Sequence, residues 1–339
     1  MDITTVADDL IVLHEGTTAH RVDGLEPGSE HVVSAFGTDV SVTTLARPAG
    51  ALRSRVATVN DVHFGETEAG RVDDHPEGPI RRAAPGDDPY PEVMNGAAAD
   101  EIAALAPDAV VVKGDLSVDG RPEEWAAFER CYRQPFGDRL HVVRGNHDSY
   151  HHQDRYAGDQ WIELAGLNIA LLDTAIPGAT TGTIRTEQLD WLDAHAEGST
   201  DPVLVMGHHQ QWIGQDSGKR SDDYFGLHPD PSDALDELAA RRPAVIAYTA
   251  GHTHRHRVRT MRQSGIPSVE IGCTKDFPGT WAEYRVFEGG VMQVVHRMSS
   301  PAALAWSESC RSLYADFGVD YESYALGTLA ERCFTIPLR

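Results

Sequence analysis

Short apolar segments recur through the middle of this 339-residue chain, and helical patterns separate them. Each segment holds four or five residues, mostly valine, leucine, isoleucine and alanine, and runs of this kind predict buried strands. The strand candidates are residues 56–59, 109–112, 140–143, 168–172, 203–206 and 245–248. The helix candidates are residues 92–106, 122–133, 186–196 and 231–241. This alternation, followed by β-rich segments at 268–272, 283–287 and 291–296, predicts an α/β core with mixed sheets.

Five of the strand candidates run directly into residue types that bind metal ions. Open α/β sheets bind ligands at the carboxyl ends of their strands, so we expect these side chains to converge on one crevice. In an extended segment residues i and i+2 point the same way, so Asp61 and His63 can face one ion. His252 and His254 can face the same pocket for the same reason. The segments are Asp61-Val62-His63, Gly114-Asp115, Gly145-Asn146-His147-Asp148, Gly207-His208-His209 and Gly251-His252-Thr253-His254.

The converging groups are carboxylates, imidazoles and an amide, without a thiolate. Such a set suits two divalent or mixed-valence transition metal ions (Mn, Fe or Zn) better than a structural cysteine-type zinc site. Seven side chains are too many for one ion, and they suit two ions that share a carboxylate. The predicted ligands are Asp61, His63, Asp115, Asn146, His208, His252 and His254.

In this order, the motifs DxH, GD, GNH[D/E], H and GHxH resemble those of the calcineurin-like metallophosphoesterase superfamily, over roughly residues 55–260. The resemblance implies two mixed β-sheets packed face to face and flanked by helices, a four-layer sandwich. It also implies the role of each ligand. Asp61, His63 and His254 hold the first metal, Asn146, His208 and His252 hold the second, and Asp115 bridges the two. His147 is then no ligand; it faces the leaving-group oxygen and protonates it or stabilises its charge.

The chain is similar, more narrowly, to bacterial class III cyclic-nucleotide phosphodiesterase-like members. Residues 171–196 resemble the segment after GNHD in those proteins, where a Gly-rich turn precedes a helix with a Gln-Leu-x-Trp-Leu run. One position departs from the wider family. Many members carry an aspartate three residues after the GD aspartate, which supports the catalytic histidine, but Val118 stands there and Asp119 follows it. Either the loop shifts, or Asp148 or water supports His147.

These motifs predict a metal-dependent phosphoester hydrolase. Its binuclear centre would activate hydroxide for in-line attack on a small phosphodiester, with a cyclic nucleotide as one candidate. A general acid such as His147 contributes about 10²–10⁴-fold to the rate. The alternative is a phosphomonoesterase with the same site. A more remote alternative is a non-catalytic metal-binding scaffold, and the complete ligand set argues against it.

The net charge and a search for targeting segments limit the binding partners and the location that we expect. The formal net charge of -23 repels polyanions, so no nucleic acid polymer and no anionic membrane surface is expected. No uncharged apolar stretch approaches the roughly 18 residues of a membrane helix, and no basic segment with an apolar run follows Met1. We therefore expect a cytoplasmic protein. The cysteines Cys131, Cys273, Cys310 and Cys333 are scattered without a CxxC pair and fit reduced thiols.

The ends of the chain predict two extensions around a metallophosphoesterase domain at residues 52–300. Residues 1–48 predict a small all-β extension with strands near 10–13, 31–36 and 40–44. Residues 24–45 within it resemble the later strands of a fibronectin type III module, over about half of such a module. Residues 301–339 predict a helical or irregular extension.

Several residues near the motifs have two possible roles. His208 is preferred to His209 as ligand, because it directly follows the strand and its glycine. For Lys113 an ion pair or packing is preferred to a phosphate contact. Two long polar loops at residues 66–91 and 211–230 are candidates for functional loops. In the second loop Trp212, Tyr224 and Phe225 either contact substrate or pack the loop, and packing is preferred.

Overall fold

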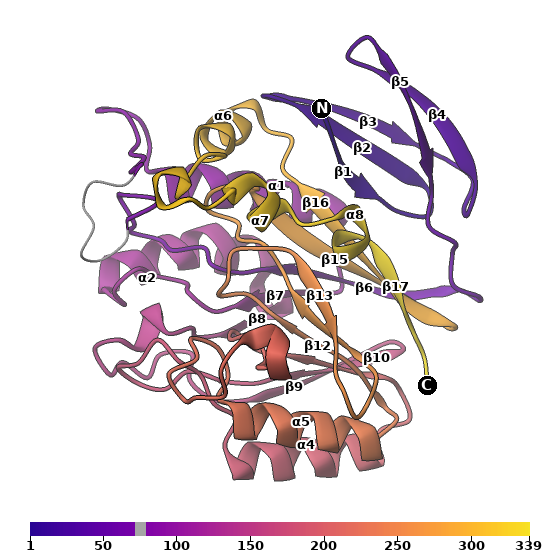
Figure 1. Ribbon diagram of the computed structural model, residues 1–339, viewed down its shortest axis with the longest axis vertical. Helices are drawn as coiled ribbons and strands as arrows, with labels where there is room; N and C mark the ends of the chain where they lie inside the picture. The colour runs from indigo at the N-terminus through magenta and orange to yellow at the C-terminus, as the bar shows by residue number, and fades with distance from the viewer. Residues whose placement is uncertain (72–78) are drawn as a thin grey trace.

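Two six-stranded mixed sheets form the centre of the computed structural model, which describes residues 1–71 and 79–339 (Figure 1). Residues 72–78 of the predicted 66–91 loop lie outside the described residues. The first sheet has the order β17 (Phe334–Pro337), β16 (Gly290–Arg297), β15 (Thr280–Phe287), β6 (Leu52–Val59), β7 (Ala109–Lys113) and β8 (Leu140–Val143). The second has the order β13 (Arg257–Thr260), β14 (Pro267–Glu270), β12 (Val245–Ala250), β11 (Val203–Met206), β10 (Leu167–Leu171) and β9 (Gln160–Leu164).

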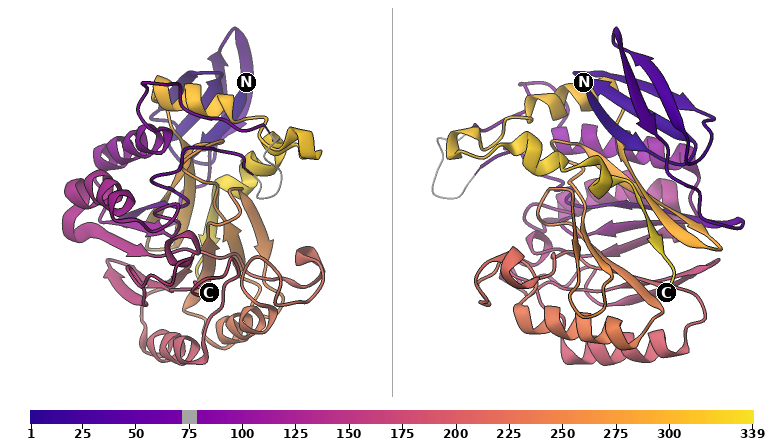
Figure 2. Two further views of the ribbon diagram at one scale, coloured as in Figure 1. Left: turned by 90° about the vertical axis from the view of Figure 1, so that its left-hand side faces the viewer. Right: turned by 45° about the vertical axis from the view of Figure 1, so that its right-hand side comes forward.

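The alternation of side chains along each strand builds the layers. In β6, Val56 packs into the core between the two sheets, whereas Ala57 packs against helices on the outer face. Helices α1 (Tyr90–Leu105) and α2 (Pro122–Phe128) cover the first sheet, and α4 (Thr186–Gly198) and α5 (Pro229–Arg241) cover the second (Figures 1 and 2). After α2 the chain continues as a π-helical turn at Glu129–Arg133 and the short α3 (Gln134–Phe136). The predicted four-layer sandwich is confirmed.

Strand direction decides where the polar strand ends meet. Strands β6, β7 and β8 run parallel to one another in the first sheet. Strands β10, β11, β12 and β14 do the same in the second. The carboxyl ends of parallel strands lie at one edge of a sheet, so each sheet delivers its strand-end residues to one edge.

The N-terminal residues form the all-β extension that the sequence predicts. Strands β1 (Asp2–Val6), β2 (Leu10–Glu15) and β3 (Thr18–Asp23) make a three-stranded antiparallel sheet, and β4 (Glu30–Ala35) and β5 (Thr38–Thr43) make a hairpin. Leu10 and Val12 pack against Met292 and Val294 of β16. The extension is therefore packed on the first sheet, at the upper right of Figure 1.

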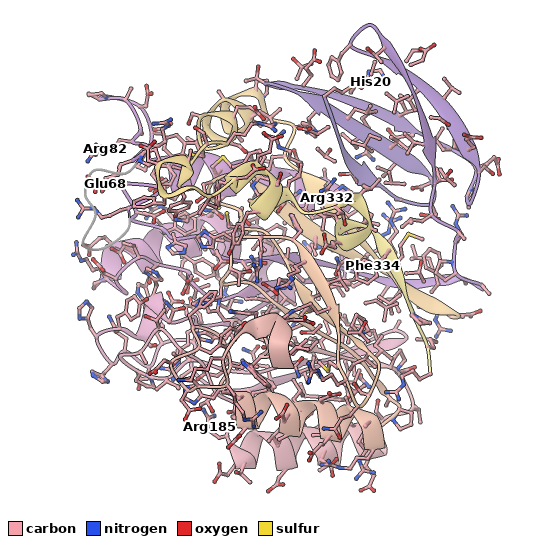
Figure 3. The ribbon with its side chains drawn as sticks, viewed as in Figure 1. His20, Glu68, Arg82, Arg185, Arg332 and Phe334 are labelled. Atoms are coloured by element: carbon pink, nitrogen blue, oxygen red, sulfur yellow. The ribbon has the colours of Figure 1, made fainter. Side chains whose placement is uncertain are left out.

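The C-terminal residues return to the same sheet. They form α6 (Pro301–Ser309), α7 (Tyr321–Leu326) and α8 (Leu329–Arg332), and then β17, which pairs antiparallel with β16. The sequence indicated helices or irregular structure here and gave no sign of this strand. The buried Arg332 guanidinium donates hydrogen bonds to the backbone oxygens of Ile3 and Thr4, which ties the C-terminal segment to β1 (Figure 3).

None of the helices in the described part of the chain combines the length and apolar character that crossing a membrane requires.

The contact between the N-terminal extension and the first sheet should make stability depend on pH through His14. Its buried ring lies 2.7 Å from Thr4 Oγ1 and 3.1 Å from the Met298 oxygen. Burial, with help from the charge of Arg297, lowers the pKa of His14 to about 4. An unfolded histidine titrates near 6.5, so below that pH the unfolded state takes up a proton that the folded state does not. The free energy of unfolding should fall by roughly 2 kcal/mol between pH 7 and pH 5 from this group.

Urea unfolding at the two pH values measures this effect. His14→Gln should lose that part of the pH dependence, and His20→Gln on the neighbouring strand β3 should keep it. Equal pH dependence in the wild type and the His14 variant would contradict the assignment.

Candidate metal centre

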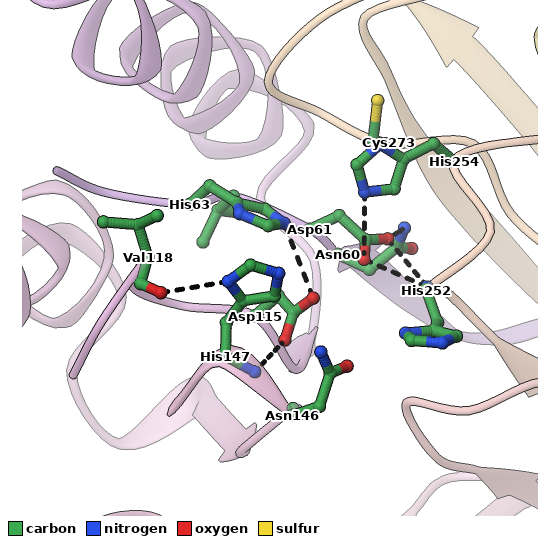
Figure 4. Close-up of polar contacts among 12 residues, drawn as sticks. Asn60, Asp61, His63, Asp115, Val118, Asn146, His147, His252, His254 and Cys273 are labelled. Atoms are coloured by element: carbon green, nitrogen blue, oxygen red, sulfur yellow. Dashed lines mark hydrogen bonds and ion pairs between the residues drawn. The ribbon is translucent and has the colours of Figure 1, made fainter. Parts of the chain in front are cut away.

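The strand ends of both sheets meet at one edge of the sandwich, and hydrogen bonds join them (Figure 4). Within the first sheet, the Asp61 amide donates to the Gly114 oxygen at 3.2 Å. Between the sheets, the His252 amide donates to Asp61 Oδ1 at 3.0 Å. The Gly251 amide donates to the His208 oxygen at 2.9 Å. Hydrogen bonds therefore connect motifs that lie far apart in the sequence.

Left-handed backbone conformations turn many of these side chains inward. Ten non-glycine residues in the described ranges have positive φ, and five of them are predicted ligands. Such conformations cost non-glycine residues free energy and cluster at functional sites. The extended geometry assumed for Asp61 with His63, and for His252 with His254, was wrong. The five are Asp61 (φ 53°), His63 (φ 46°), Asp115 (φ 48°), His252 (φ 67°) and His254 (φ 53°).

Two glycines of the motifs are required by close approach. A Cβ on Gly145 would lie 2.2 Å from Asp115 Oδ1, and one on Gly251 would lie 2.6 Å from Asp61 Oδ2. Both carboxylates therefore pack directly against backbone without a side chain between them.

His208 and His252 each turn one ring nitrogen to a backbone oxygen and the other inward. His208 Nδ1 lies 2.8 Å from the Lys113 oxygen, and its Nε2 lies 3.2 Å from Asp115 Oδ2. His252 Nε2 lies 2.5 Å from the Phe225 oxygen, and its Nδ1 lies 3.2 Å from His208 Nε2. A carbonyl only accepts, so the outer nitrogen of each ring carries a proton. The inner nitrogen of His252 is left to bind a cation. Although burial opposes it, the Asp115 and Asp61 carboxylates raise the pKa of His208 to about 9, so the inner nitrogen of His208 binds a cation only after it releases its proton.

His63 and His254 have carboxylates near their outer nitrogens, at distances longer than a hydrogen bond. His63 Nδ1 lies 3.9 Å from Glu66 Oε1, and His254 Nδ1 lies 3.8 Å from Asp276 Oδ2. Lys275 connects the two carboxylates, with Nζ 2.5 Å from Glu66 and 3.7 Å from Asp276. The inner nitrogens face the ligand carboxylates instead, at 3.5 Å from Asp115 Oδ2 for His63 and at 3.6 Å from Asp61 Oδ1 for His254.

The structure brings all seven predicted ligands together, with His147 at their edge. The candidate ligand atoms of Asp61, His63 and His254 lie within 4.8 Å of one another, and so do those of Asp61, Asp115 and His208. Asn146 Oδ1 lies 3.0 Å from His208 Nε2, and its Nδ2 donates to Tyr150 Oη at 2.6 Å. The amide oxygen therefore faces the same space as the imidazoles.

The electrostatics of this cage suit bound cations. Burial raises the pKa of Asp61 to about 6, and nearby Asp115 pushes it the same way. Burial would also raise the pKa of Asp115, but the adjacent His208 and His147 hold it well below its usual value. Burial lowers the pKa of His63 to about 4 and that of His252 to about 3, so both rings are neutral near pH 7 and offer lone pairs.

His63 gives the most direct sign of a missing partner. Its ring is buried, and neither nitrogen makes a hydrogen bond with any of the described residues. Buried polar atoms are rarely left without a partner. Oxygen and imidazole donors around such an atom fit a transition metal ion.

A backbone carbonyl supports His147. His147 Nδ1 lies 2.9 Å from the Val118 oxygen, and its backbone amide donates to Asp115 Oδ1 at 3.0 Å (Figure 4). The carbonyl of Val118 thus makes the contact that we expected from a shifted loop, from Asp148 or from water. Asp148 instead accepts hydrogen bonds from the backbone amides of Leu116, Ser117 and Gly145. It thereby joins the loop after Asp115 to the loop that carries His147.

The neighbouring residues fall into distinct roles. Lys113 is fully buried and donates from Nζ to Thr249 Oγ1 at 2.9 Å, which agrees with packing and not with a phosphate contact. His209 is also buried, and its Nδ1 lies 2.8 Å from Thr174 Oγ1. In the predicted 211–230 loop Trp212 is buried, whereas the Phe225 side chain is 44% exposed beside His252.

Sequence reasoning missed Glu66, Lys275 and Asp276. The sequence did carry a signal for Lys275 and Asp276. Strand β14 runs parallel to β12 and is followed by Gly272-Cys273-Thr274-Lys275-Asp276, so the strand-end argument applied to it as well. Glu66 follows the DxH motif by three residues, in a turn that carries no pattern of its own.

The strand ends of this four-layer sandwich enclose carboxylates and imidazoles, which are the ligand types that a metal-dependent phosphoesterase needs. The chain belongs to the calcineurin-like phosphoesterase family, whose model matches residues 54–256.

Curated relatives are similar over part of their length. One is the "Probable cyclic nucleotide phosphodiesterase syc0937_d" of Synechococcus sp., 30% identical over 158 residues, 44% of this chain and 59% of that protein. Another is "3',5'-cyclic adenosine monophosphate phosphodiesterase CpdA" of Pseudomonas aeruginosa, 28% identical over 180 residues, 51% of this chain and 64% of that protein. A third is the "Probable glycerophosphodiester phosphodiesterase GpdQ" of Arcobacter nitrofigilis, 28% identical over 165 residues, 44% of this chain and 57% of that protein. Each match covers less than two thirds of the relative.

A solved structure supports the fold. The dimetal phosphatase from Danio rerio superposes with a TM-score of 0.52 at 15% identity, covering 73% of this chain and 97% of that chain.

Proposed function

We propose that the chain hydrolyses a small phosphodiester with two transition metal ions bound in the strand-end cage. The observation that carries this proposal is the orientation of four imidazoles. Each turns one nitrogen to an oxygen behind it. The other nitrogen faces a buried carboxylate in His63, His208 and His254, and it faces His208 Nε2 in His252. The first ion would be held by Asp61, His63, Asp115 and His254, and the second by Asp115, Asn146, His208 and His252.

Bound there, two ions would supply Lewis-acid charge for the phosphoryl group and a nucleophile at neutral pH. The residues of the chain organise the rest. The His147 amide binds Asp115 Oδ1, which leaves Oδ2 facing His63 and His208. One carboxylate is thereby fixed between the imidazoles of both proposed ion sites.

His147 is the proposed proton donor to the leaving alcohol. Because Nδ1–H is held by the Val118 oxygen, Nε2 is the nitrogen that can release a proton. Loss of that proton leaves the neutral Nδ1–H tautomer, which the same carbonyl already stabilises. The ring is half-buried and lies 4.6 Å from the ring of His63, so it stands at the mouth of the cage.

A diester is favoured over a monoester because the relatives above are named for cyclic nucleotides and glycerophosphodiesters. The net charge of -23 favours a small substrate over a nucleic acid polymer. The test is turnover of the metal-reconstituted protein with bis(p-nitrophenyl) phosphate, p-nitrophenyl phosphate, cyclic AMP and a glycerophosphodiester. We expect faster cleavage of diesters. Cleavage of the monoester alone would replace the proposal with a phosphatase, and no turnover by fully metallated protein would refute it.

Glu66→Gln should weaken metal binding without unfolding the protein. Glu66 faces the outer nitrogen of His63, and partners of this kind are worth about 10–100-fold in metal affinity. Competition with a chelator measures the affinity, and circular dichroism checks the fold. The matched control is Glu68→Gln, because Glu68 lies two residues on and pairs with Arg71 and Arg82 at the surface (Figure 3). Equal affinities for the two variants would show that Glu66 does not position His63.

A further inference from the structure

A pocket of about 400 Å³ lies beside the proposed metal ligands His252 and His254. Its walls come from two segments that are distant in the sequence. The 211–230 loop contributes Phe225, and the C-terminal segment contributes Tyr314, Val319, Tyr321 and Tyr324. The C-terminal segment lies outside residues 54–256, so this wall is not part of the region that the family model matches.

The C-terminal wall is fixed to the turn that carries the two histidines. Tyr324 Oη donates to the Thr253 oxygen at 3.1 Å. The His256 amide donates to the Ala325 oxygen at 3.0 Å. Thr253 lies between the two histidines of GHxH, so this contact joins the wall to the turn that carries the proposed metal ligands.

The surface of the pocket is aromatic and apolar. The rings of Tyr321 and Tyr324 are nearly parallel, with centroids 6.1 Å apart and 23° between planes, and Tyr314 meets Tyr321 edge-on at 5.0 Å. Phe225 is 44% exposed and Val319 is 37% exposed. Exposed apolar side chains that gather in a concavity are typical of a ligand site.

We propose that this pocket binds a planar aromatic group of the phosphoester, a nucleobase or an aryl ring, while the phosphate lies at the metal centre. The inference rests on the proposed function and names the substrate class. Stacking of a base on an aromatic side chain is worth about 1–3 kcal/mol. A glycerol group offers no flat face to these rings.

Aromatic side chains also bind quaternary ammonium groups, and two features here argue against such a ligand. Tyr321 is buried and its ring is stacked against that of Tyr324, so the two rings do not surround a point. The Arg255 guanidinium lies 5.0 Å from the centre of the Tyr324 ring and already makes the cation–π contact with it.

The test compares phosphate esters that differ in the group beside the phosphate. Isothermal titration calorimetry of the metal-loaded protein measures Kd for AMP, ribose 5-phosphate and phosphocholine. Where the protein cleaves these esters, kcat/KM for each replaces the Kd. The wild type should prefer AMP to ribose 5-phosphate by about 5- to 150-fold. Phe225→Ala and Val319→Ser should lose most of this preference.

Phe317→Ala is the matched control, because Phe317 is 40% exposed in the same segment and does not line the pocket. It should keep the preference for AMP. No preference in the wild type, or a preference that survives both variants, would overturn the inference. So would tighter binding of phosphocholine that depends on Phe225.

Turnover of bis(p-nitrophenyl) phosphate tests the proposed function separately. Turnover without a preference for AMP refutes only the pocket, and a Phe225-dependent preference without turnover refutes only the proposed function.

Discussion

Asp115→Asn should lower kcat/KM for bis(p-nitrophenyl) phosphate by about a thousandfold or more, together with a loss of bound metal. Asparagine keeps the shape of the side chain and one acceptor oxygen but removes its charge. Asp115 Oδ2 lies 3.5 Å from His63 Nε2 and 3.2 Å from His208 Nε2, so the lost charge serves both proposed ion sites. Steady-state kinetics and elemental analysis of the purified variant measure the two effects.

The matched control is Asp119→Asn in the same loop. The Asp119 carboxylate lies 2.7 Å from Arg121 at the surface and points at no imidazole of the cage, so its variant should keep both the metal and the rate. An Asp115 variant that retained two ions and full turnover would remove the shared carboxylate from the mechanism.

The strand-end pattern predicted the centre of the fold and the candidate ligands because two signals coincide there. Buried strands must be apolar, so β7 and β11 are visible as uninterrupted runs. A polar residue directly after such a run is rarely needed for the strand itself, so it indicates a functional site. The structure brings the predicted ligands Asp115 and His208 together from these two strands of different sheets.

The backbone of the motifs was not predictable by the same reasoning. Alternation of side chains is a property of strands, and it was extended into turns where it does not hold. Asp61 and His63 both have positive φ, so the segment that carries them is not extended and its side chains do not alternate. Aspartate and histidine adopt positive φ more often than most residues do, but only a minority of them do so, and the residue type alone does not announce the conformation.

Several edge strands were missed because their apolar pattern is weak. β3 (Thr18–Asp23) is largely solvent-facing, and β17 is four residues long and ends in Pro337. Proline is tolerated at an edge because no further strand needs its amide. The support of His147 was also hidden, because every residue has a carbonyl and only the fold brings that of Val118 within 2.9 Å of the ring.

His147→Ala should lower kcat by about 10²–10⁴-fold on a diester with an alkyl leaving group, such as cyclic AMP, while both metal ions stay bound. An alkoxide is a poor leaving group unless it receives a proton, and Nε2 of His147 is the proposed donor. The loss should be much smaller for bis(p-nitrophenyl) phosphate, because nitrophenolate leaves as a stabilised anion. A purely structural role for the ring would lower both rates alike.

The metal content of the variant distinguishes these roles from a third one, in which His147 is a metal ligand. The ring also lies within reach of His63 and Asp115, close enough for all three to share an ion. If the alanine variant lost metal, His147 would be a ligand, and full turnover on cyclic AMP would exclude it as the acid. Since the Val118 carbonyl holds Nδ1 and leaves Nε2 free, we expect the leaving group to decide the size of the effect while the metal content stays unchanged.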